Sequence, residues 1–168
     1  MNNDKISIRP IEHTDLEKLH KWRNDKNIFD NLGGGFFPRS RSQMNKWMDS
    51  FVDNTLTNQK FIITVEEEAI GYISLSDINY KNGNADLGLY IGEDSARGKG
   101  YAKMALNIIK DYAKNTVNMR KISLNVLEEN TNAIKLYEKC GFIVCGCKRK
   151  ERFVNGDYKN VILMEVFL

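Results

Sequence analysis

The sequence predicts an α/β fold in which helices flank one mixed β-sheet. Two dipeptides that favour tight hairpin turns, Asn82-Gly83 and Asn155-Gly156, each separate a pair of β-like segments, which indicates antiparallel neighbours. A segment with helical periodicity, 101–113, lies between the apolar-alternating strands 86–91 and 121–126. Because a helical crossover joins parallel strands, we expect one parallel pair in a mostly antiparallel sheet of about seven strands, with about four helices.

Bulk composition limits the class of protein. The chain has 168 residues, of which 42% are hydrophobic, and this suits one compact domain spanning residues 1–168. The mean hydropathy is -0.47. No run of about twenty apolar residues is present, and the first residues, MNNDKISIRP, contain no apolar signal-peptide core. We therefore expect a cytoplasmic protein with no membrane partner.

Charge and cysteine content exclude further classes. A formal net charge of +3 suits a polyanionic cofactor, whereas a nucleic-acid-binding surface usually carries a stronger basic excess, so we expect no nucleic-acid partner. The three cysteines, Cys140, Cys145 and Cys147, do not form the pattern of a disulfide framework, and neither histidine lies near them at zinc-ligand spacing. We predict reduced thiols and no metal.

The first third of the chain predicts one short strand and two helices. The strand covers residues 6–10 and ends at a proline. Thr14-Asp-Leu-Glu17 has the pattern of a capping box and opens a helix that ends at residues 22–25. Residues 40–43 cap a second helix. Its core-facing side chains are Met44, Trp47, Met48 and Phe51.

The rest of the chain predicts the central sheet and the remaining helices. Residues 60–65 and 69–77 are two strands around an acidic turn. Asn130 begins a helix that Gly141 ends, as glycine commonly does at a helix C-terminus. The segment 142–168 contains the last two strands.

A basic, glycine-rich turn marks the start of the helix that follows strand 86–91. The turn consists of Arg97, Gly98, Lys99 and Gly100. The first N–H groups of a helix lack intrahelical partners and lie at the positive end of the helix dipole, and glycine permits close approach of a ligand to the backbone. The turn is therefore a candidate site for phosphate or pyrophosphate, although it matches neither the P-loop nor the dinucleotide-binding pattern.

Two motifs in this chain are specific enough to indicate a family. Arg97, Gly100 and Ala102 follow the pattern Q/R-x-x-G-x-G/A, and residues 130–142 follow N-x-x-A-x-x-L-Y-x-x-x-G-F. Both patterns, in this order, resemble those of the GNAT N-acetyltransferase superfamily. The helix ending 21–25, Lys-Trp-Arg-Asn-Asp, resembles the branch that includes ribosomal-protein, polyamine and nucleotide-aminosugar acetyltransferases.

This resemblance implies acetyl-coenzyme A as co-substrate, with no metal. It also implies that strand 86–91 diverges from its parallel neighbour 121–126 and that the pantetheine arm lies in the gap. The residues implied in cofactor binding are Leu89, Tyr90 and Ile91 for the pantetheine and acetyl oxygen, and Arg97, Gly98, Lys99, Gly100, Tyr101 and Ala102 for the pyrophosphate. Asn130 would bind the cofactor through its side-chain amide, although a plain helix cap would look the same in sequence.

Acetyl transfer to an amine requires a base and an acid. An alkylammonium group with a pKa near 10 is about one part in a thousand neutral at pH 7, so deprotonation costs on the order of 4 kcal/mol without a base. Asp86 is the candidate base, acting through a water molecule, with Asp77 in reserve; a plain turn carboxylate is the alternative. Tyr137 is the candidate acid for the departing sulfur, and a packed aromatic ring is its alternative.

The sequence leaves several classes of acetyl acceptor as alternatives. We favour direct transfer to a small-molecule amine, of the polyamine or amino-sugar type, over transfer to a protein N-terminus. The apolar loop 33–38 and Trp47 are candidate walls of an acceptor pocket, with a plain connection as the loop's alternative role. Carboxylates that would suit a polyamine are Asp25, Asp30, Asp49 and Asp53, whereas Arg39 and Arg41 beside them indicate an acidic acceptor.

Three further expectations complete the prediction. A coenzyme A-binding regulatory module without catalysis is the alternative of another class, which an intact Tyr137 and an acidic Asp86 disfavour. The basic run 148–152 is interpreted as a solvated face, with binding of a phosphate or acidic acceptor as the alternative. The family resemblance implies a possible homodimer formed through C-terminal strands or helices.

Overall fold

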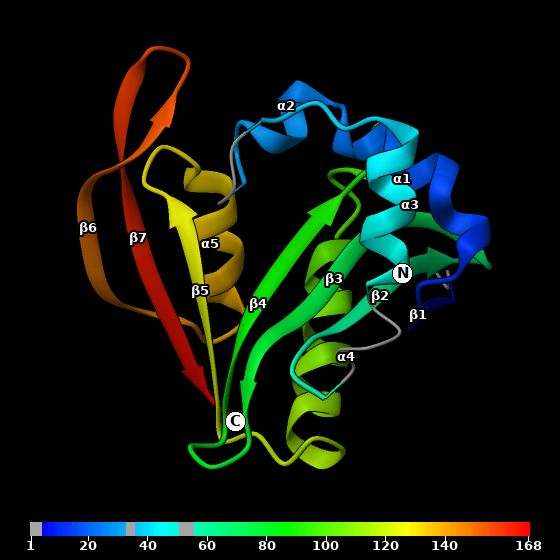
Figure 1. The fold of residues 1–168 in the computed structure, drawn as a ribbon. Coiled ribbons are helices and arrows are strands. Elements are labelled where there is room, and N and C mark those ends of the chain that lie inside the picture. Colours follow the sequence, from blue (N-terminus) through cyan, green and yellow to red (C-terminus); the bar gives the residue numbers. More distant parts are fainter. Residues whose placement is uncertain (1–4, 33–35, 51–55) are drawn as a thin grey trace.

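Seven strands form one sheet in the described part of this computed structural model, which comprises residues 5–32, 36–50 and 56–168. Their order across the sheet is β1-β2-β3-β4-β5-β7-β6 (Figure 1). The strands are β1 (Ile6–Pro10), β2 (Gln59–Val65), β3 (Glu68–Asn79), β4 (Asn84–Ile91), β5 (Lys121–Leu127), β6 (Ile143–Val154) and β7 (Asp157–Phe167). All neighbours are antiparallel except β4 and β5, which are parallel. The predicted mixed sheet is confirmed.

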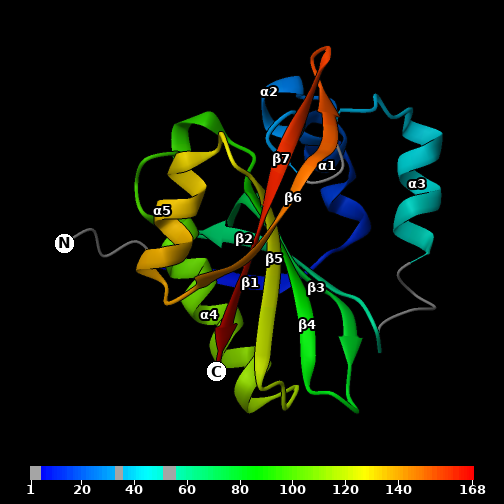
Figure 2. The same cartoon turned by 90° about the vertical axis from the view of Figure 1, so that its left-hand side faces the viewer.

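Helices cover both faces of this sheet, as the two views in Figure 1 and Figure 2 show. They are α1 (Leu16–Arg23), α2 (Lys26–Phe29), α3 (Arg41–Asp49), α4 (Tyr101–Asn115) and α5 (Thr131–Lys139). The first three pack against Ile62, Tyr72 and Tyr90, whereas α4 and α5 pack against the face that carries Ile63 and Ile73. Among the residues described, no helix combines the length and the apolar character needed to cross a membrane.

Helix α4 shows how the sequence pattern produces this packing. Ala105, Leu106, Ile109 and Ala113 recur at helical spacing and are fully buried against the sheet. Burying an isoleucine or leucine side chain contributes roughly 1.5–3 kcal/mol relative to leaving it exposed. The helix that carries the glycine-rich turn is therefore firmly attached to the sheet.

Several predicted boundaries are confirmed. Ser40 caps α3 by accepting the N–H of Gln43 at 3.2 Å, and the Gln43 side chain accepts the N–H of Ser40 at 2.9 Å. Gly141 follows α5 with a φ of 90°, a conformation that favours glycine. Met44 and Met48 of the predicted core face are buried, whereas Phe51 lies outside the described residues.

The start of α1 differs from the prediction. The expected capping box, Thr14–Glu17, is not formed; the box joins Glu12 and Asp15 of a 3-10 turn (His13–Asp15) that precedes the helix. The Asp15 carboxylate accepts the N–H of Glu12 at 2.9 Å and two hydrogen bonds from the guanidinium of Arg9, both at 2.7 Å. This contact with Arg9 on β1 is tertiary, so a pattern of neighbouring residues could not show it.

Helix α2 was also absent from the prediction. It has four residues, begins after Asp25 and is capped when the Asp25 side chain accepts the N–H of Asn27 at 2.8 Å. A helix this short contains no full period of apolar residues. Its buried residues, Ile28 and Phe29, join the cluster under α1 and α3, and this burial stabilises it.

Candidate active site

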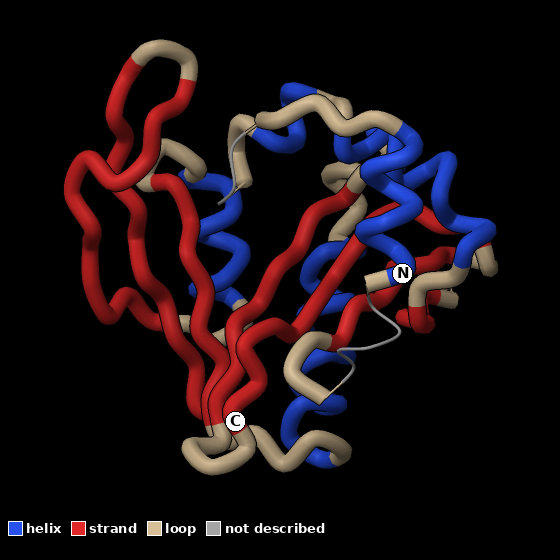
Figure 3. The backbone as a smooth tube through the Cα atoms, in the orientation of Figure 1, coloured by secondary structure: helices blue, strands red, loops and turns tan. Residues whose placement is uncertain are grey.

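The parallel strands β4 and β5 pair over only three positions. Residues 84–86 lie opposite residues 121–123, and no later pair of these two strands occurs in the described chain. Beyond this point β4 stays with β3 and β5 stays with β7. Figure 3 shows the two strands side by side at one end and far apart at the other. The splayed pair that the resemblance implied is therefore present.

The widening gap exposes backbone groups along one edge of β4. Gly92 donates its N–H to the carbonyl of Ile70 at 2.8 Å. Residues that bond to a partner alternate along an antiparallel strand, so Tyr90 also directs its backbone groups at β3. Leu89 and Ile91 consequently direct their N–H and C=O groups into the gap. An extended amide chain can bind such an edge as an added strand would.

The glycine-rich turn lies at the N-terminus of α4, which begins at Tyr101. Gly98 and Gly100 have φ values of 75° and 85°, which glycine adopts without strain. A Cβ atom built on either glycine would meet no atom within 4 Å, so this side of the turn is open to a ligand. The Tyr101 side chain is buried. The backbone N–H groups of the first turn of α4 are therefore the groups that can face a phosphate.

Arg97 is positioned between this turn and the end of β4. Its Nε donates to the carbonyl of Ile91 at 3.3 Å, and its guanidinium forms an ion pair with Asp94 at 2.6 Å. Lys99 and the guanidinium of Arg97 add positive charge beside the helix N-terminus. The open backbone edge and the basic turn together fit a long amide-containing ligand that ends in a diphosphate.

A cavity of about 520 Å³ adjoins the gap. Its lining residues are Arg23, Phe29, Leu32, Phe37, Arg39, Tyr72, Ser76, Asp86, Leu87, Gly88, Leu89, Tyr90, Asn125 and Tyr137. The cavity thus brings together the two predicted catalytic residues, Asp86 from β4 and Tyr137 from α5. The predicted pyrophosphate residues 97–102 and Asn130 do not line it.

Asp86 is a half-buried carboxylate at the point where β4 leaves β5. It lies opposite Ser123 in the last pair of the two strands. Burial raises the pKa of Asp86, and the charge of Asp77 raises it further, against the opposing effect of Lys121 and Lys148. A carboxylate with a raised pKa is a stronger base than an exposed one.

Tyr137 is nearly buried, with 9% of its surface exposed, and its ring packs edge-on against Phe142 with centroids 5.6 Å apart. Burial raises the pKa of Tyr137 to about 12, with a smaller contribution from Cys140. The hydroxyl therefore keeps its proton at neutral pH and can donate a hydrogen bond into the cavity.

Asn130 is the N-cap of α5. Its Oδ1 accepts the N–H of Ala133 at 3.2 Å. This is the capping role that the sequence could not separate from cofactor binding. The cap uses the oxygen of the side-chain amide, so a contact with the cofactor through the nitrogen stays a prediction.

Sequence reasoning missed several lining residues of the cavity. Tyr72 stacks on Tyr90 with centroids 5.2 Å apart and an interplanar angle of 16°. Ser76 lies four residues after Tyr72 on β3, so both side chains are on the same face of the strand. The period-two alternation of β3 shows that Tyr72 and Ser76 share one face of the strand. Whether that face lines a cavity depends on how β4 and α1 pack beside it, which the sequence does not show. Asn125 of β5 had no local signal.

The predicted wall of the acceptor pocket is found in part. Phe37 lines the cavity, whereas residues 33–35 of the same loop lie outside the described residues. Trp47 does not line the cavity; its ring centroid lies 6.5 Å from that of Tyr72, which does. In the basic run 148–152 of β6, Arg152 donates a hydrogen bond to the carbonyl of Leu32 at 3.2 Å.

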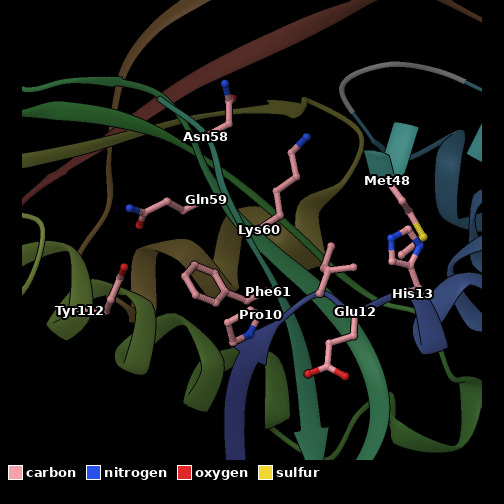
Figure 4. A pocket seen from close by; sticks show the side chains of 10 residues that line it. Pro10, Glu12, His13, Met48, Asn58, Gln59, Lys60, Phe61 and Tyr112 are labelled. Carbon is pink, nitrogen blue, oxygen red and sulfur yellow. The ribbon is translucent and has the colours of Figure 1, made fainter. Parts of the chain in front are cut away.

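A second cavity, of about 380 Å³, shares no lining residue with the first. In Figure 4 its side chains extend from His13 and Met48 at one end, past Lys60 and Phe61, to Tyr112 at the other. None of the residues predicted to act in binding or catalysis lines it. The first cavity is the candidate active site because it holds both predicted catalytic residues, Asp86 and Tyr137.

Comparison with known proteins agrees with this geometry. A family model described as an acetyltransferase (GNAT) domain matches residues 5–143, a range that includes both motifs. Spermidine N(1)-acetyltransferase of Vibrio cholerae is 29% identical over 164 residues, which cover 98% of this chain and 94% of that protein. Ribosomal-protein-serine acetyltransferase of Escherichia coli is 29% identical over 103 residues, which cover 61% of this chain and 57% of that protein.

A solved structure extends the similarity to three dimensions. The crystal structure of spermidine N-acetyltransferase from Vibrio cholerae in complex with CoA and spermine has a TM-score of 0.90 and 30% sequence identity to this chain. The match covers 96% of this chain and 95% of that one.

Proposed function

Since this chain belongs to the acetyltransferase (GNAT) domain family and is an N-acetyltransferase, we propose that it transfers the acetyl group of acetyl-coenzyme A directly to a primary amine of a small molecule. We place this acceptor among compounds of the polyamine or amino-sugar type. One observation carries the proposal: Asp86 and Tyr137 line the same cavity at the point where β4 separates from β5.

Asp86 acts as the general base in this proposal. It accepts the proton of the substrate ammonium group, directly or through one water molecule, so that the neutral amine can attack the acetyl carbon. Burial and the charge of Asp77 raise the pKa of Asp86, which makes its carboxylate more basic. Asp77 is exposed and does not line the cavity, which favours Asp86 over this reserve candidate.

Tyr137 acts as the acid. Acetyl-coenzyme A supplies a thioester, whose sulfur leaves as a thiolate that needs a proton or a hydrogen bond. The hydroxyl of Tyr137 is protonated at neutral pH and donates to that sulfur. Its ring is held edge-on against Phe142, with the centroids 5.6 Å apart.

The donor site is proposed along β4 and α4. The backbone groups of Leu89 and the N–H of Ile91, which face the gap, would bind the amide chain of pantetheine, whereas the Ile91 carbonyl already accepts a hydrogen bond from Arg97. The side chain of Tyr90 would line the cavity beside the acetyl group. The turn 97–102 would hold the pyrophosphate through N–H groups, Arg97 and Lys99. Asn130 would contribute its amide nitrogen.

Amide hydrogen exchange tests this donor site. We expect the N–H groups of Leu89 and Ile91 to exchange rapidly in the free protein and roughly tenfold more slowly, or slower still, with coenzyme A bound. The N–H of Tyr90, which faces β3, serves as an internal control that is protected in both states. Exchange rates at Leu89 and Ile91 that are the same with and without coenzyme A would contradict the proposed site.

Thiol release from acetyl-coenzyme A tests the reaction. Polyamines, amino sugars and a peptide with a free N-terminus form the panel of amines, and mass spectrometry identifies the acetylated product. We expect release that depends on the amine and matches product one to one. Binding of coenzyme A without amine-dependent release would instead indicate a non-catalytic coenzyme A-binding module.

We also propose that residues 1–168 act as one domain, in the cytoplasm and as a homodimer. Support for a dimer comes from exposed apolar side chains on β6 and β7, namely Ile143, Val144, Phe153, Tyr158 and Phe167. Light scattering measures the mass in solution, and a monomer at high concentration would contradict the dimer.

A further inference from the structure

Two arginines line the cavity that holds Asp86 and Tyr137. Arg23 is the last residue of α1, and Arg39 lies just before α3. Within the described residues, neither guanidinium forms an ion pair with a carboxylate. Asp86 is the one carboxylate among the described lining residues, so basic groups outnumber acidic ones here.

The guanidinium of Arg23 is held in place by aromatic rings. It lies 4.8 Å from the ring centroid of Phe29 and 5.7 Å from that of Trp47. Contact with aromatic faces fixes the plane of the group while its edge can still donate hydrogen bonds. Burial lowers the pKa of Arg23, and the neighbouring charge of Arg39 lowers it further, yet arginine stays charged at neutral pH.

Arg39 is anchored to α1 through its main chain. Its N–H donates to Oδ1 of Asn24 at 2.8 Å, and its carbonyl accepts Nδ2 of Asn24 at 3.0 Å and Nε2 of His20 at 2.9 Å. These bonds fix the origin of the Arg39 side chain beside Arg23. Two like charges held close together repel one another, and an anion between them would relieve this repulsion.

Lys60 on β2 adds a third cation near Arg23, although it lines the second cavity and not the one that holds Asp86. Its Nζ lies 5.2 Å from the centroid of the Trp47 ring that Arg23 also contacts. Burial, with a smaller contribution from the charge of Arg23, lowers the pKa of Lys60 to about 8. A polycationic acceptor in the cavity would place further positive charge beside Arg23 and Arg39, which costs electrostatic free energy.

The carboxylates that would suit a polyamine lie elsewhere. Asp25 caps α2, Asp30 forms an ion pair with Lys26, and Asp49 lies 3.9 Å from the imidazole of His13. None of the three lines the cavity that holds Asp86. Asp30 lines a neighbouring cavity of about 470 Å³, which shares Phe37 with the first. Asp53, the fourth, lies outside the described residues.

We propose that the acceptor carries an oxyanion group, a phosphate or a carboxylate, which Arg23 and Arg39 bind while its amine lies at Asp86. The inference rests on the proposed function and narrows it to an acidic amine, such as an amino-sugar phosphate, rather than a polyamine. The planar guanidinium groups match such oxygens with paired hydrogen bonds. Arg23 and Arg39 are then the residues that determine acceptor specificity.

Pairs of acceptors that differ in one group test this inference. Glucosamine and glucosamine 6-phosphate differ by the phosphate, and propylamine and β-alanine differ by the carboxylate; spermidine represents the polyamines. We expect kcat/KM for an acidic member to exceed that of its neutral partner, and that of spermidine, by about tenfold or more. The advantage should shrink at high ionic strength. Which pair shows it identifies phosphate or carboxylate.

Variants assign the preference to the arginines. Arg39→Gln should lower the ratio of kcat/KM between the acidic and neutral partners by about tenfold, and Arg23→Gln should do the same. Arg41→Gln is the matched control, because Arg41 pairs with Glu17 at 2.8 Å and does not line the cavity. Coenzyme A affinity and circular dichroism confirm that each variant is folded.

The possible outcomes separate this inference from the proposed function. A preference for spermidine over every acidic amine, insensitive to Arg39→Gln, would overturn the acidic acceptor and leave acetyl transfer intact. A protein that neither binds coenzyme A nor releases thiol with any amine would overturn the proposed function itself.

Discussion

At the scale of single residues, burial has the same effect on Asp86 and on Tyr137 but suits them to opposite roles. Removal from water disfavours the charged form of each group, so both pKa values are raised. For the carboxylate of Asp86, this means a stronger base. For the phenol of Tyr137, it means a donor that stays protonated.

Replacing Asp86 tests its role as base. Asp86→Asn should lower kcat/KM at pH 7 by about 100-fold, the usual size of a general-base effect. In the wild-type protein, activity should rise with pH as Asp86 ionises, and the rise should lie above the usual range of an aspartate because the pKa of Asp86 is raised. The pH–rate profile of the variant should lack this rise. Its activity should increase only as the pH approaches the pKa of the amine, where the amine is neutral without a base. Initial rates against pH measure both.

Asp77 provides the control for this prediction. Its charge contributes to raising the pKa of Asp86, so Asp77→Asn should move the acidic limb to lower pH without a large loss of rate at pH 7. Asparagine also tolerates the φ of 50° at this position. A loss of activity in Asp77→Asn, with Asp86→Asn unaffected, would identify Asp77 as the base.

Tyr137→Phe removes the hydroxyl and keeps the ring. We expect kcat to fall by about 10- to 100-fold, because the departing sulfur loses its donor, with coenzyme A affinity little changed. Since the pKa of Tyr137 is raised to about 12, the wild-type rate should show no alkaline limb from this group below about pH 10. Unchanged kcat in the variant would mean that Tyr137 only packs.

At the scale of elements, the ends of strands and helices supply the binding groups. The exposed edge of β4 exists because β5 turns away after residue 123. The first N–H groups of α4 lack intrahelical partners, as at any helix start, and the glycines before it leave space for a ligand. Helix α5 combines two tasks at its start, since Asn130 caps it and is also predicted to contact the cofactor.

Two substitutions at Asn130 separate these tasks. Asn130→Ala should lower the free energy of unfolding by about 1 kcal/mol through loss of the cap. Asn130→Asp keeps an oxygen that caps the helix, so stability should change by less than about 0.5 kcal/mol. Both should weaken coenzyme A binding, because both lack the amide nitrogen. Urea unfolding and calorimetry measure the two effects; unchanged affinity in both variants would leave Asn130 as a cap alone.

At the scale of the whole molecule, the buried carboxylate of Asp15 joins the start of α1 to the edge strand β1. Asp15, 4% exposed, receives two hydrogen bonds from Arg9 of β1 and one from the N–H of Glu12. Burial alone would raise the pKa of Asp15, but these hydrogen bonds and the charge of Arg9 outweigh it, so the pKa is lowered.

This contact predicts a pH-dependent stability. A lowered folded pKa means that the contribution is present above the usual aspartate pKa of about 4 and is lost as pH falls through the folded value. Asp15→Asn should lower the free energy of unfolding at pH 7 by about 1.5–3 kcal/mol and flatten its decrease in acid. Asp111→Asn, on an exposed part of α4, is the control and should change stability by less than about 0.5 kcal/mol. Equal acid sensitivity of Asp15→Asn and wild type would contradict this role.

The mixed sheet with its one parallel pair, the hairpins and most helix boundaries could be predicted from the sequence, and so could the turn before α4, whereas the position of β7 between β5 and β6 could not. Hairpin turns at residues 82–83 and 155–156, the Ser40 cap and the glycine after α5 depend on neighbours along the chain, so short patterns carry them. The start of α1 was wrong because Arg9 draws Asp15 into a contact between β1 and the helix.

By itself, the sequence determined the strand and helix order, the basic turn and the two motifs. Local conformational preference and periodicity depend on residues that are neighbours in the chain. Only the tertiary structure decided that β4 and β5 part after three pairs and that Asp86, Tyr137, Arg23 and Arg39 line one cavity. These residues come from separate elements, and burial among distant parts of the chain, rather than any local preference, brings their charges and pKa values to one place.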